Sequence, residues 1–416
     1  GLTHEELWFG IKHLRSVGIK KIPLRDKKDA FFCYTTTPDV LSEQLYNLHA
    51  TAGQMSFPTS DNIPGEIAAA DTPSARQYNE RFLIQEAIAS SQLEGAATTR
   101  VVAKQMIRSK RMPRDDSERM IVNNYHTMQK ILLYKDRPLD LELMFEIHRL
   151  ITEDTFEHPD QVGRFRNDDE SVNVRSPDGE VVHEPPKACD LVQRFQAMCD
   201  FANGKTPDYF IHPVIRSIIL HFWLAYDHPF VDGNGRCARA LFYWSMLRQG
   251  YHIFEYISIS QILLKAPIQY GMAYLYSETD ENDLTYFIIY QLQVIQRAIE
   301  ELQIYVSKKE KERKEVLALF QAGCLFNYRQ QELLAHALHH AGHHYTVEEH
   351  KAAHQIVYET ARKDLNDLYK YKLLKRKKSG KAFVYISPPD LDALIQKNYM
   401  VSEHSSSFMI QPTEGQ

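Results

Sequence analysis

The stretch YDHPFVDGNGRCARA, Tyr226 to Ala240, decides the fold of this chain. Within twelve of its residues it holds a histidine, a carboxylate, a Gly-Asn-Gly turn and two arginines. The flanking sequences, IHPVIRSIILHFWLAYD before it and RCARALFYWSMLRQG at its end, are apolar at helical spacing. We therefore expect residues 228–235 to join two buried helices.

The turn itself predicts an anion-binding site built from backbone. Gly233 and Gly235 allow left-handed backbone angles, which Asn234 also tolerates. A turn of this kind at the start of a helix directs several free N–H groups to one point. Arg236 and Arg239 lie three residues apart on the new helix, so they share a face and flank the same anion. The guanidinium fork suits phosphate oxygens.

A single phosphate hardly needs the turn and both arginines, whereas a polyphosphate does, and two further groups in the stretch add to this site. Asp232 would repel a phosphate unless a bound Mg²⁺ bridged the two. An imidazole beside a metal-bound phosphate is a natural general base, and this role falls to His228. The sequence therefore predicts a polyphosphate site with a metal ion and a base.

Three other interpretations fit the sequence less well. GNGRCA matches the dinucleotide pattern G-x-G-x-x-A, which should follow a strand, whereas a long helix precedes it here. Gly204-Lys205-Thr206 resembles the end of a phosphate-binding P-loop, but Cys199 stands where the first glycine is required. A structural salt-bridge network through Arg239 would need neither two glycines nor a histidine.

The composition is that of a soluble protein with two or three domains. The chain has 416 residues, of which 44% are hydrophobic and 25% charged. Its formal net charge of -5 argues against non-specific coating of nucleic acid but allows one basic patch. Five scattered cysteines without C-x-x-C spacing suit a reducing cytoplasm. We expect a cytoplasmic protein without a membrane segment, because no apolar run approaches the roughly 18 residues that span a bilayer.

Periodicity and composition divide the chain into five parts, and the expected fold class is mostly α. The expected parts are a helical region over 1–115, a central helical domain over 116–300, a charged helical linker over 301–315, a C-terminal domain over 316–395 and a polar tail over 396–416. Inside the central domain, SVNVR, SPDG and EVVHE predict a small β-hairpin over 171–184.

The C-terminal domain has the element order of a winged helix-turn-helix. YRQQELLAHALHHAG, TVEEHKAAHQI and VYETARKDLNDLYKYKLL predict three helices, and KRKKSGKAFVYI predicts a basic hairpin that turns at Ser379-Gly380. DNA is therefore a candidate partner, and a protein-docking or dimer module is the alternative. Seven histidines crowd this domain: His336, His339, His340, His343, His344, His350 and His354. His336 and His340 are spaced like a metal-binding pair, but no cysteine or H-E-x-x-H pattern supports a metal, so we expect the seven to be surface histidines.

Residues 228–239, HPFVDGNGRCAR, resemble the Fic signature H-P-F-x-[DE]-G-N-G-R-x-x-R without departure. The likeness extends over about 90–293, through GRFR at 163–166 and HEPP after the predicted hairpin. The resemblance implies a Fic-type helical core that transfers AMP from ATP to a Ser, Thr or Tyr hydroxyl of a target protein. By matching position, His228 would deprotonate the hydroxyl and Asp232 would hold Mg²⁺, while Phe230 would anchor the loop in the core.

The resemblance also assigns the nucleotide and target contacts. Asn234 and the backbone of Gly233 and Gly235 would bind the α- and β-phosphates, Arg236 the β-phosphate and Arg239 the γ-phosphate. Tyr270 is a candidate adenine contact. The hairpin resembles the family's flap, which pairs with an extended target segment as an added strand. The flap residues expected to dock the target are Val172, Asn173, Val174, Val181 and Val182.

A second motif, SSQLEG from Ser90 to Gly95, resembles the family's inhibitory signature [ST]-x-x-x-E-[GN]. It predicts an inhibitory helix over about 77–95, in which Glu94 pairs with Arg239 in place of the γ-phosphate. The main interpretation is thus an autoinhibited adenylyltransferase, with a homodimer as a candidate assembly. One alternative is removal of AMP from a modified protein, with Glu94 orienting a water. Another is a DNA-binding regulator whose Fic fold only senses nucleotide.

Overall fold

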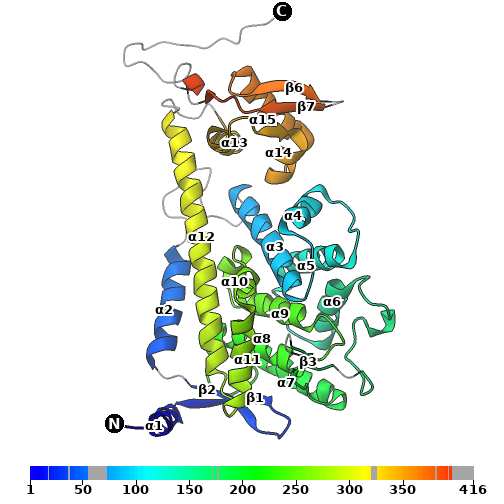
Figure 1. Ribbon diagram of the computed structural model, residues 1–416, viewed down its shortest axis with the longest axis vertical. Coiled ribbons are helices and arrows are strands. Elements are labelled where there is room, and N and C mark those ends of the chain that lie inside the picture. The colour runs from blue at the N-terminus through cyan, green and yellow to red at the C-terminus, as the bar shows by residue number, and fades with distance from the viewer. Residues whose placement is uncertain are drawn as a thin grey trace, which may run out of the picture. The chain divides into compact units, whose positions relative to one another are not determined.

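The computed structural model describes residues 1–16, 18–35, 38–54, 73–170, 172–175, 178–319, 326–379, 382–391 and 393–395. The tail predicted at 396–416 lies outside the described residues. The chain forms two compact units, one of residues 1–55 and 79–302 and the other of residues 56–78 and 303–416. Helices predominate and the sheets are small, which confirms the mostly α prediction (Figure 1).

Two helices at the centre of the first unit, α8 (Pro213–Asp227) and α9 (Asn234–Arg248), are buried along almost their whole length. The helix α8 begins with Pro213 at its first position, where the missing N–H is harmless, and His212 accepts from the N–H of Val214. It ends because His228 takes a left-handed φ of 46°, and α9 starts after Gly233 at φ 84°. The two buried helices and the tight turn between them are as predicted.

Further helices pack around this pair in the first unit (Figure 1). Among them, α5, α6 and η3 contact α9, and α7 contacts α8. The remaining helical elements that begin in this unit are α1 (His4–Ser16), α2 (Pro38–Gln54), α4 (Arg100–Ser109), α5 (Asp116–Tyr134), α6 (Leu141–Thr152), η1 (Pro159–Gln161), η2 (Ala188–Asp190), α7 (Leu191–Ala202), η3 (His252–Glu255), α10 (Ile259–Lys265), α11 (Pro267–Thr279) and α12 (Thr285–Leu319).

The helix predicted to be inhibitory, α3 (Pro73–Leu93), ends in a Schellman motif. Gly95 has φ 93° and donates to the carbonyl of Gln92, and Ala96 donates to the carbonyl of Ser91. Only glycine adopts this angle without strain, so the chain stops being helical at Glu94. Glu94 therefore lies in the turn directly after Leu93, at the tip of the helix.

Two small antiparallel hairpins lie in the first unit. The strands β1 (Ile19–Arg25) and β2 (Phe31–Thr35) pair in a region that the sequence predicted to be helical. The second hairpin is the predicted one, but it is shorter than expected: β3 is Val174–Arg175 and β4 is Val181–His183. We call the strands β3 and β4 the flap. Val172 and Asn173 precede the first strand of the flap rather than belonging to it.

The second unit contains the predicted helices and basic hairpin, and one strand that was not predicted. Its elements are α13 (Tyr328–His339), β5 (His344–Thr346), α14 (Val347–His354), α15 (Tyr358–Lys370), β6 (Lys375–Ser379) and β7 (Ala382–Ile386). The short β5 pairs with β7, so the sheet has the order β5-β7-β6. His350 and His354 are buried, so the expectation of surface histidines is wrong for this pair. None of the helices in the described part of the chain has the length and hydrophobicity needed to cross a bilayer.

Candidate functional site

His228 is held as a neutral imidazole at the end of α8. Its Nδ1 lies 3.2 Å from the carbonyl oxygen of Ala225, and its backbone N–H donates to Leu224 at 3.0 Å. A carbonyl can only accept, so Nδ1 carries the hydrogen and Nε2 keeps its lone pair. Burial lowers the pKa of His228 to about 4. The ring is therefore available as a base at neutral pH, with Nε2 as the accepting atom.

The turn after His228 is braced by Asn234 and Phe230. The Asn234 amide donates to the Phe230 carbonyl at 2.8 Å and accepts from the Phe230 N–H at 2.9 Å. Its side chain is therefore engaged within the turn, and a contribution of Asn234 to phosphate binding would come from its backbone. Phe230 itself is fully buried, which confirms its predicted role as a core anchor.

A second histidine, His148 on α6, contacts the turn at Phe230 and Asp232. Its ring stacks on Phe230, with centroids 3.8 Å apart and planes 10° apart. Its Nδ1 accepts from the N–H of Gly163 at 3.0 Å, so Nε2 is the protonated nitrogen that donates to the carbonyl of Asp232 at 3.1 Å. Burial lowers the pKa of His148 to about 4, which keeps this tautomer neutral.

Arg166, in the predicted GRFR segment, clamps the other side of the turn. Its N–H donates to the carbonyl of Pro229 at 2.9 Å, and its Nε donates to the carbonyl of His228 at 3.0 Å. The guanidinium also donates to the carbonyl of Pro186, in the segment after the flap. One buried arginine thus joins the turn to the base of the flap.

Arg236 and Asp232 form an ion pair on the first turn of α9. The guanidinium of Arg236 donates to Asp232 Oδ2 at 2.8 Å and to the carbonyl of Ile151 at 3.2 Å. Arg236 is buried, whereas the side chain of Asp232 is 56% exposed. The Nε of Arg236 has no hydrogen-bond partner among the described residues. The Asp232 carboxylate of this pair is therefore exposed. The guanidinium of Arg236 lies buried beside it and keeps an Nε–H that can still donate a hydrogen bond.

Arg239 binds the tip of α3. It donates to Glu94 Oε1 at 2.7 Å and to the hydroxyl and carbonyl oxygens of Ser90, each at 2.8 Å. The arginine side chain is 2% exposed and that of Glu94 25% exposed. Burial opposes the charge on Arg239, but the Glu94 carboxylate keeps the pKa of the guanidinium above its ordinary value. The contact that the inhibitory signature predicted is present.

The Glu94 carboxylate also fills the space beside Gly235. A Cβ at Gly235 would lie 2.1 Å from Glu94 Oε1 and 3.1 Å from an Arg239 nitrogen. Only a glycine leaves room for an anion this close to the start of α9. The carboxylate thus occupies the surface on which the turn was predicted to bind phosphate.

Tyr270 lies near this ion pair but is engaged with other rings. Its hydroxyl is 2.8 Å from Nε2 of the buried His221 and 3.3 Å from the hydroxyl of Tyr274. Burial raises the pKa of Tyr270, so its hydroxyl stays protonated. These contacts supply a partner for His221 that the sequence did not suggest.

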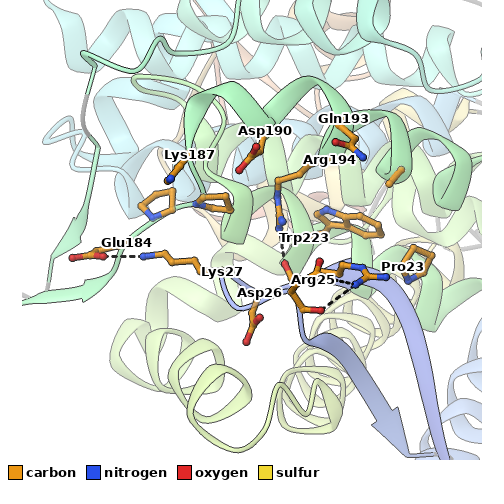
Figure 2. Close-up of a pocket in the computed structure, with 14 residues that line it drawn as sticks. Pro23, Arg25, Asp26, Lys27, Glu184, Lys187, Asp190, Gln193, Arg194 and Trp223 are labelled. Carbon is orange, nitrogen blue, oxygen red and sulfur yellow. Dashed lines mark hydrogen bonds and ion pairs between the residues drawn. The ribbon is translucent and has the colours of Figure 1, made fainter.

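The flap is exposed at its second strand, where the side chains of Val181 and Val182 are each 42% exposed. Beyond the flap lies a pocket of about 670 Å³, lined by the turn of the first hairpin and by residues after β4 (Figure 2). Lys27 reaches across it to Glu184 at 2.9 Å, as the dashed line in Figure 2 marks. The pocket does not include His228 or Arg239. The pocket therefore lies between the N-terminal hairpin and the segment after the flap, and it is separate from the turn over residues 228–235.

The residues around the turn have the chemistry to hold a phosphate group with Mg²⁺. The face of α9 lacks a Cβ at Gly235, and Arg236 has an unused buried donor. Among the residues described, no group of three or more His, Cys, Asp or Glu side chains could hold a metal ion. Asp232 would then be a single protein ligand, which suits Mg²⁺ because this ion usually keeps several waters and bridges substrate phosphates.

Comparison with known proteins agrees with this geometry. The model of the Fic/DOC family matches residues 138–246, which include α6, the flap, α8 and most of α9. The chain contains a Fic domain. It is 34% identical over 120 residues to the protein adenylyltransferase Fic of Nematostella vectensis, and 33% identical over 110 residues to that of Drosophila melanogaster. These alignments cover 29% and 26% of this chain and 26% and 20% of the relatives, so the chain matches only about a quarter of their length.

The Fic fold is also found among solved structures. A Fic family protein from Desulfovibrio desulfuricans covers 85% of this chain and 97% of its own, with a TM-score of 0.55 at 19% identity. A Fic domain containing signaling protein from Bacteroides thetaiotaomicron covers 64% of this chain and 97% of its own, with a TM-score of 0.51 at 20% identity. At these identities the likeness concerns the fold alone.

Three supporting residues of the Fic domain were not found from the sequence: His148, Arg166 and Glu86. Glu86 lies on α3 and is buried, and its carboxylate accepts from Tyr243, from Ser258 and from both N–H and hydroxyl of Ser260. The GRFR segment was noted, but nothing in it indicated a clamp. A buried acid in an otherwise apolar helix face is the one signal that could have identified Glu86.

Proposed function

We propose that this chain is a protein adenylyltransferase that transfers AMP from ATP to a hydroxyl of a target protein. The observation that carries the proposal is the fixed tautomer of His228, which leaves the lone pair on Nε2. His228 begins the turn that leads into α9, where Gly235 leaves room for an anion. The names of the curated relatives support the same reaction.

The proposed step uses the residues of the turn in distinct roles. His228 Nε2 takes the proton of the target hydroxyl, and the hydroxyl oxygen forms a bond to the α-phosphorus. The bond from the α-phosphorus to the bridging oxygen breaks, and pyrophosphate leaves. Bound Mg²⁺, held by Asp232, would offset charge on the phosphates. Arg236 and Arg239 hold the β- and γ-phosphates, the backbone of Gly233, Asn234 and Gly235 lines the cradle, and Tyr270 stays a candidate adenine contact.

We propose further that Glu94 restrains this activity, with Ser90 and Gly95 shaping the helix tip that presents it. The ion pair from Glu94 to Arg239 uses the cation that would otherwise bind the γ-phosphate. A second candidate reaction follows from the same geometry: Glu94, 25% exposed, could orient a water that removes AMP from a modified protein. The two reactions differ in what Glu94→Gly does, since it should increase transfer but abolish removal.

The test uses ATP labelled at either the α- or the γ-phosphate, with Mg²⁺ and a cell extract. In the Glu94→Gly background, protein should become labelled from α-labelled ATP and not from γ-labelled ATP. Adding His228→Ala should remove the label, because loss of a general base typically costs roughly 10² to 10⁴ in rate. It should leave ATP affinity nearly intact. Labelling from γ-labelled ATP but not from α-labelled ATP would show that the chain is a kinase. Undiminished transfer by His228→Ala would show that His228 is not the general base.

The second unit is proposed to be a winged helix that binds DNA through its basic strand. The exposed residues Lys375, Arg376, Lys377 and Lys378 in β6 support this proposal. Lys381, also predicted to contact DNA, lies outside the described residues. Binding to phosphates weakens steeply with salt, so a gel-shift series over genomic fragments should give a salt-sensitive band. Absence of such a band would favour the alternative, a protein-docking or dimer module in a cytoplasmic protein.

A further inference from the structure

His183, the last residue of the flap, places both ring nitrogens against acceptors. Its Nδ1 lies 2.8 Å from Glu278 Oε2, and its Nε2 lies 2.7 Å from the carbonyl oxygen of Tyr226. Its side chain is only 9% exposed. Neither a carboxylate nor a carbonyl can donate, and a neutral imidazole has a single N–H. The two hydrogen bonds can therefore exist together only when His183 is an imidazolium.

The carbonyl that His183 binds belongs to the helix end that carries the proposed base. At the last turn of α8, the Leu224 and Ala225 carbonyls accept from the backbone and ring of His228, and the Tyr226 carbonyl accepts from His183. Two histidines thus satisfy the carbonyls that a helix end leaves unpaired. The partial negative charge of these carbonyls favours a cation at this point.

The charged and titratable groups around His183 come from several elements. Glu278 faces it from α11, the Tyr226 ring contacts it from α8, and Asp227 follows at the end of that helix. Asp227 is paired with Arg194 at 2.6 Å, and Glu184, next to His183, is paired with Lys27. Glu278 has no other ion pair among the described residues, so it is the carboxylate that responds to the charge on His183.

We propose that His183 is a positioning residue whose imidazolium ties the flap to the helix end that presents His228. The inference rests on the proposed function, because the flap would hold the target segment whose hydroxyl His228 deprotonates. With a neutral ring, one of the two nitrogens would turn a lone pair toward its acceptor, and that contact would fail.

The substitution Glu278→Gln separates this role from simple packing. The amide it introduces can donate to Nδ1, so a neutral His183 with its hydrogen on Nε2 satisfies both contacts. The contact between the flap and the end of α8 should then persist. Hydrogen–deuterium exchange of residues 178–187 in the full chain, with and without the substitution, measures this directly.

We expect Glu278→Gln to exchange at the rate of the unsubstituted chain. His183→Gln, which cannot carry the charge, should exchange at least about threefold faster than either. Equal exchange in the three chains would overturn the inference. Labelling of extract proteins from α-labelled ATP in the Glu94→Gly background is measured in parallel. Absence of label would refute the proposed function without touching the exchange result.

Discussion

Single residues at the turn divide into those that would react under the proposed function and those that hold them. Asp232 presents an exposed carboxylate, whereas Phe230, His148 and Arg166 fix the backbone between the two helices. The signature residues could be predicted from the sequence because they are contiguous. The supports could not, because His148 and Arg166 come from other segments and meet the turn only in the folded chain.

The residue-scale prediction concerns Glu94. Replacing Glu94 with Gly should increase AMP transfer, including self-labelling, at least about tenfold, because Arg239 becomes available to the γ-phosphate. A misplacement of about 1 Å at the reacting phosphorus can cost on the order of 10²-fold. Glu94→Gln, which keeps the shape but removes the charge, should give an intermediate rate. Label transfer from α-labelled ATP measures all three chains.

Arg239→Ala is the matched control for that prediction. It breaks the same ion pair, but it also removes the γ-phosphate contact, so it should not activate. Wild-type rates in Glu94→Gly would show that Glu94 is only a capping residue.

At the scale of elements, the position of α3 depends on a buried carboxylate. Glu86 receives hydrogen bonds from Tyr243 on α9 and from the serines before and within α10. Glu86 lies on α3, and Glu94 follows the last residue of that helix, so Glu86 holds the helix that brings Glu94 to Arg239. The helix could be predicted from its apolar spacing, but its anchor could not, because the donors lie 157 to 174 residues later in the chain.

Substitution of Glu86 by Ala should therefore loosen α3. It leaves several buried donors unpaired, at about 1–3 kcal/mol for each, so the free energy of unfolding of the first unit should fall by at least about 2 kcal/mol. AMP transfer should rise at the same time at temperatures where the protein remains folded, because Glu94 is held less firmly. Chemical denaturation and label transfer measure the two effects, with Glu94→Gly as the control that activates without a comparable loss of stability. An unchanged denaturation midpoint would show that Glu86 is not the anchor.

The hairpin β1–β2 illustrates what sequence patterns miss at this scale. IKKIPLR contains a proline and alternates weakly, so it gave no strand signal. Its second strand is completed by residues far along the chain: Cys33 accepts from Leu284 and donates to Asn282, and Thr35 donates to the hydroxyl of Thr285. Such long-range pairing leaves no local pattern.

At the scale of the whole molecule, buried neutral histidines make the fold sensitive to acid. Burial lowers the pKa of each of them, to about 4 for His148, His212 and His228 and to about 3 for His221 and His354. In the unfolded chain a histidine titrates near 6.5. The unfolded state therefore binds more protons between these values, and stability is complete above about pH 6.5 and is lost as the pH falls through 4.

We expect the melting temperature to fall by at least about 5 °C between pH 7 and pH 5, since one kcal/mol shifts the midpoint of a domain of this size by roughly 2–4 °C. Calorimetry at pH 5.5 in buffers of different ionisation enthalpy should detect proton uptake on unfolding. A melting temperature that is constant or rises on acidification would contradict this assignment of neutral buried rings.

Gly235 also bears on how such a protein can evolve. Under the proposed function, the same bare stretch of backbone receives either a phosphate or the Glu94 carboxylate, since a Cβ there would lie 2.1 Å from the carboxylate oxygen. A substitution at Gly235 would therefore abolish both the inhibitory contact of Glu94 and the proposed AMP transfer. A descendant with such a substitution would be inactive. A glutamate codon becomes a glycine codon through one nucleotide change, so a constitutively active descendant is a single heritable step away at position 94. Lineages of this fold should accordingly lose their restraint far more readily at the helix tip than at the turn it covers.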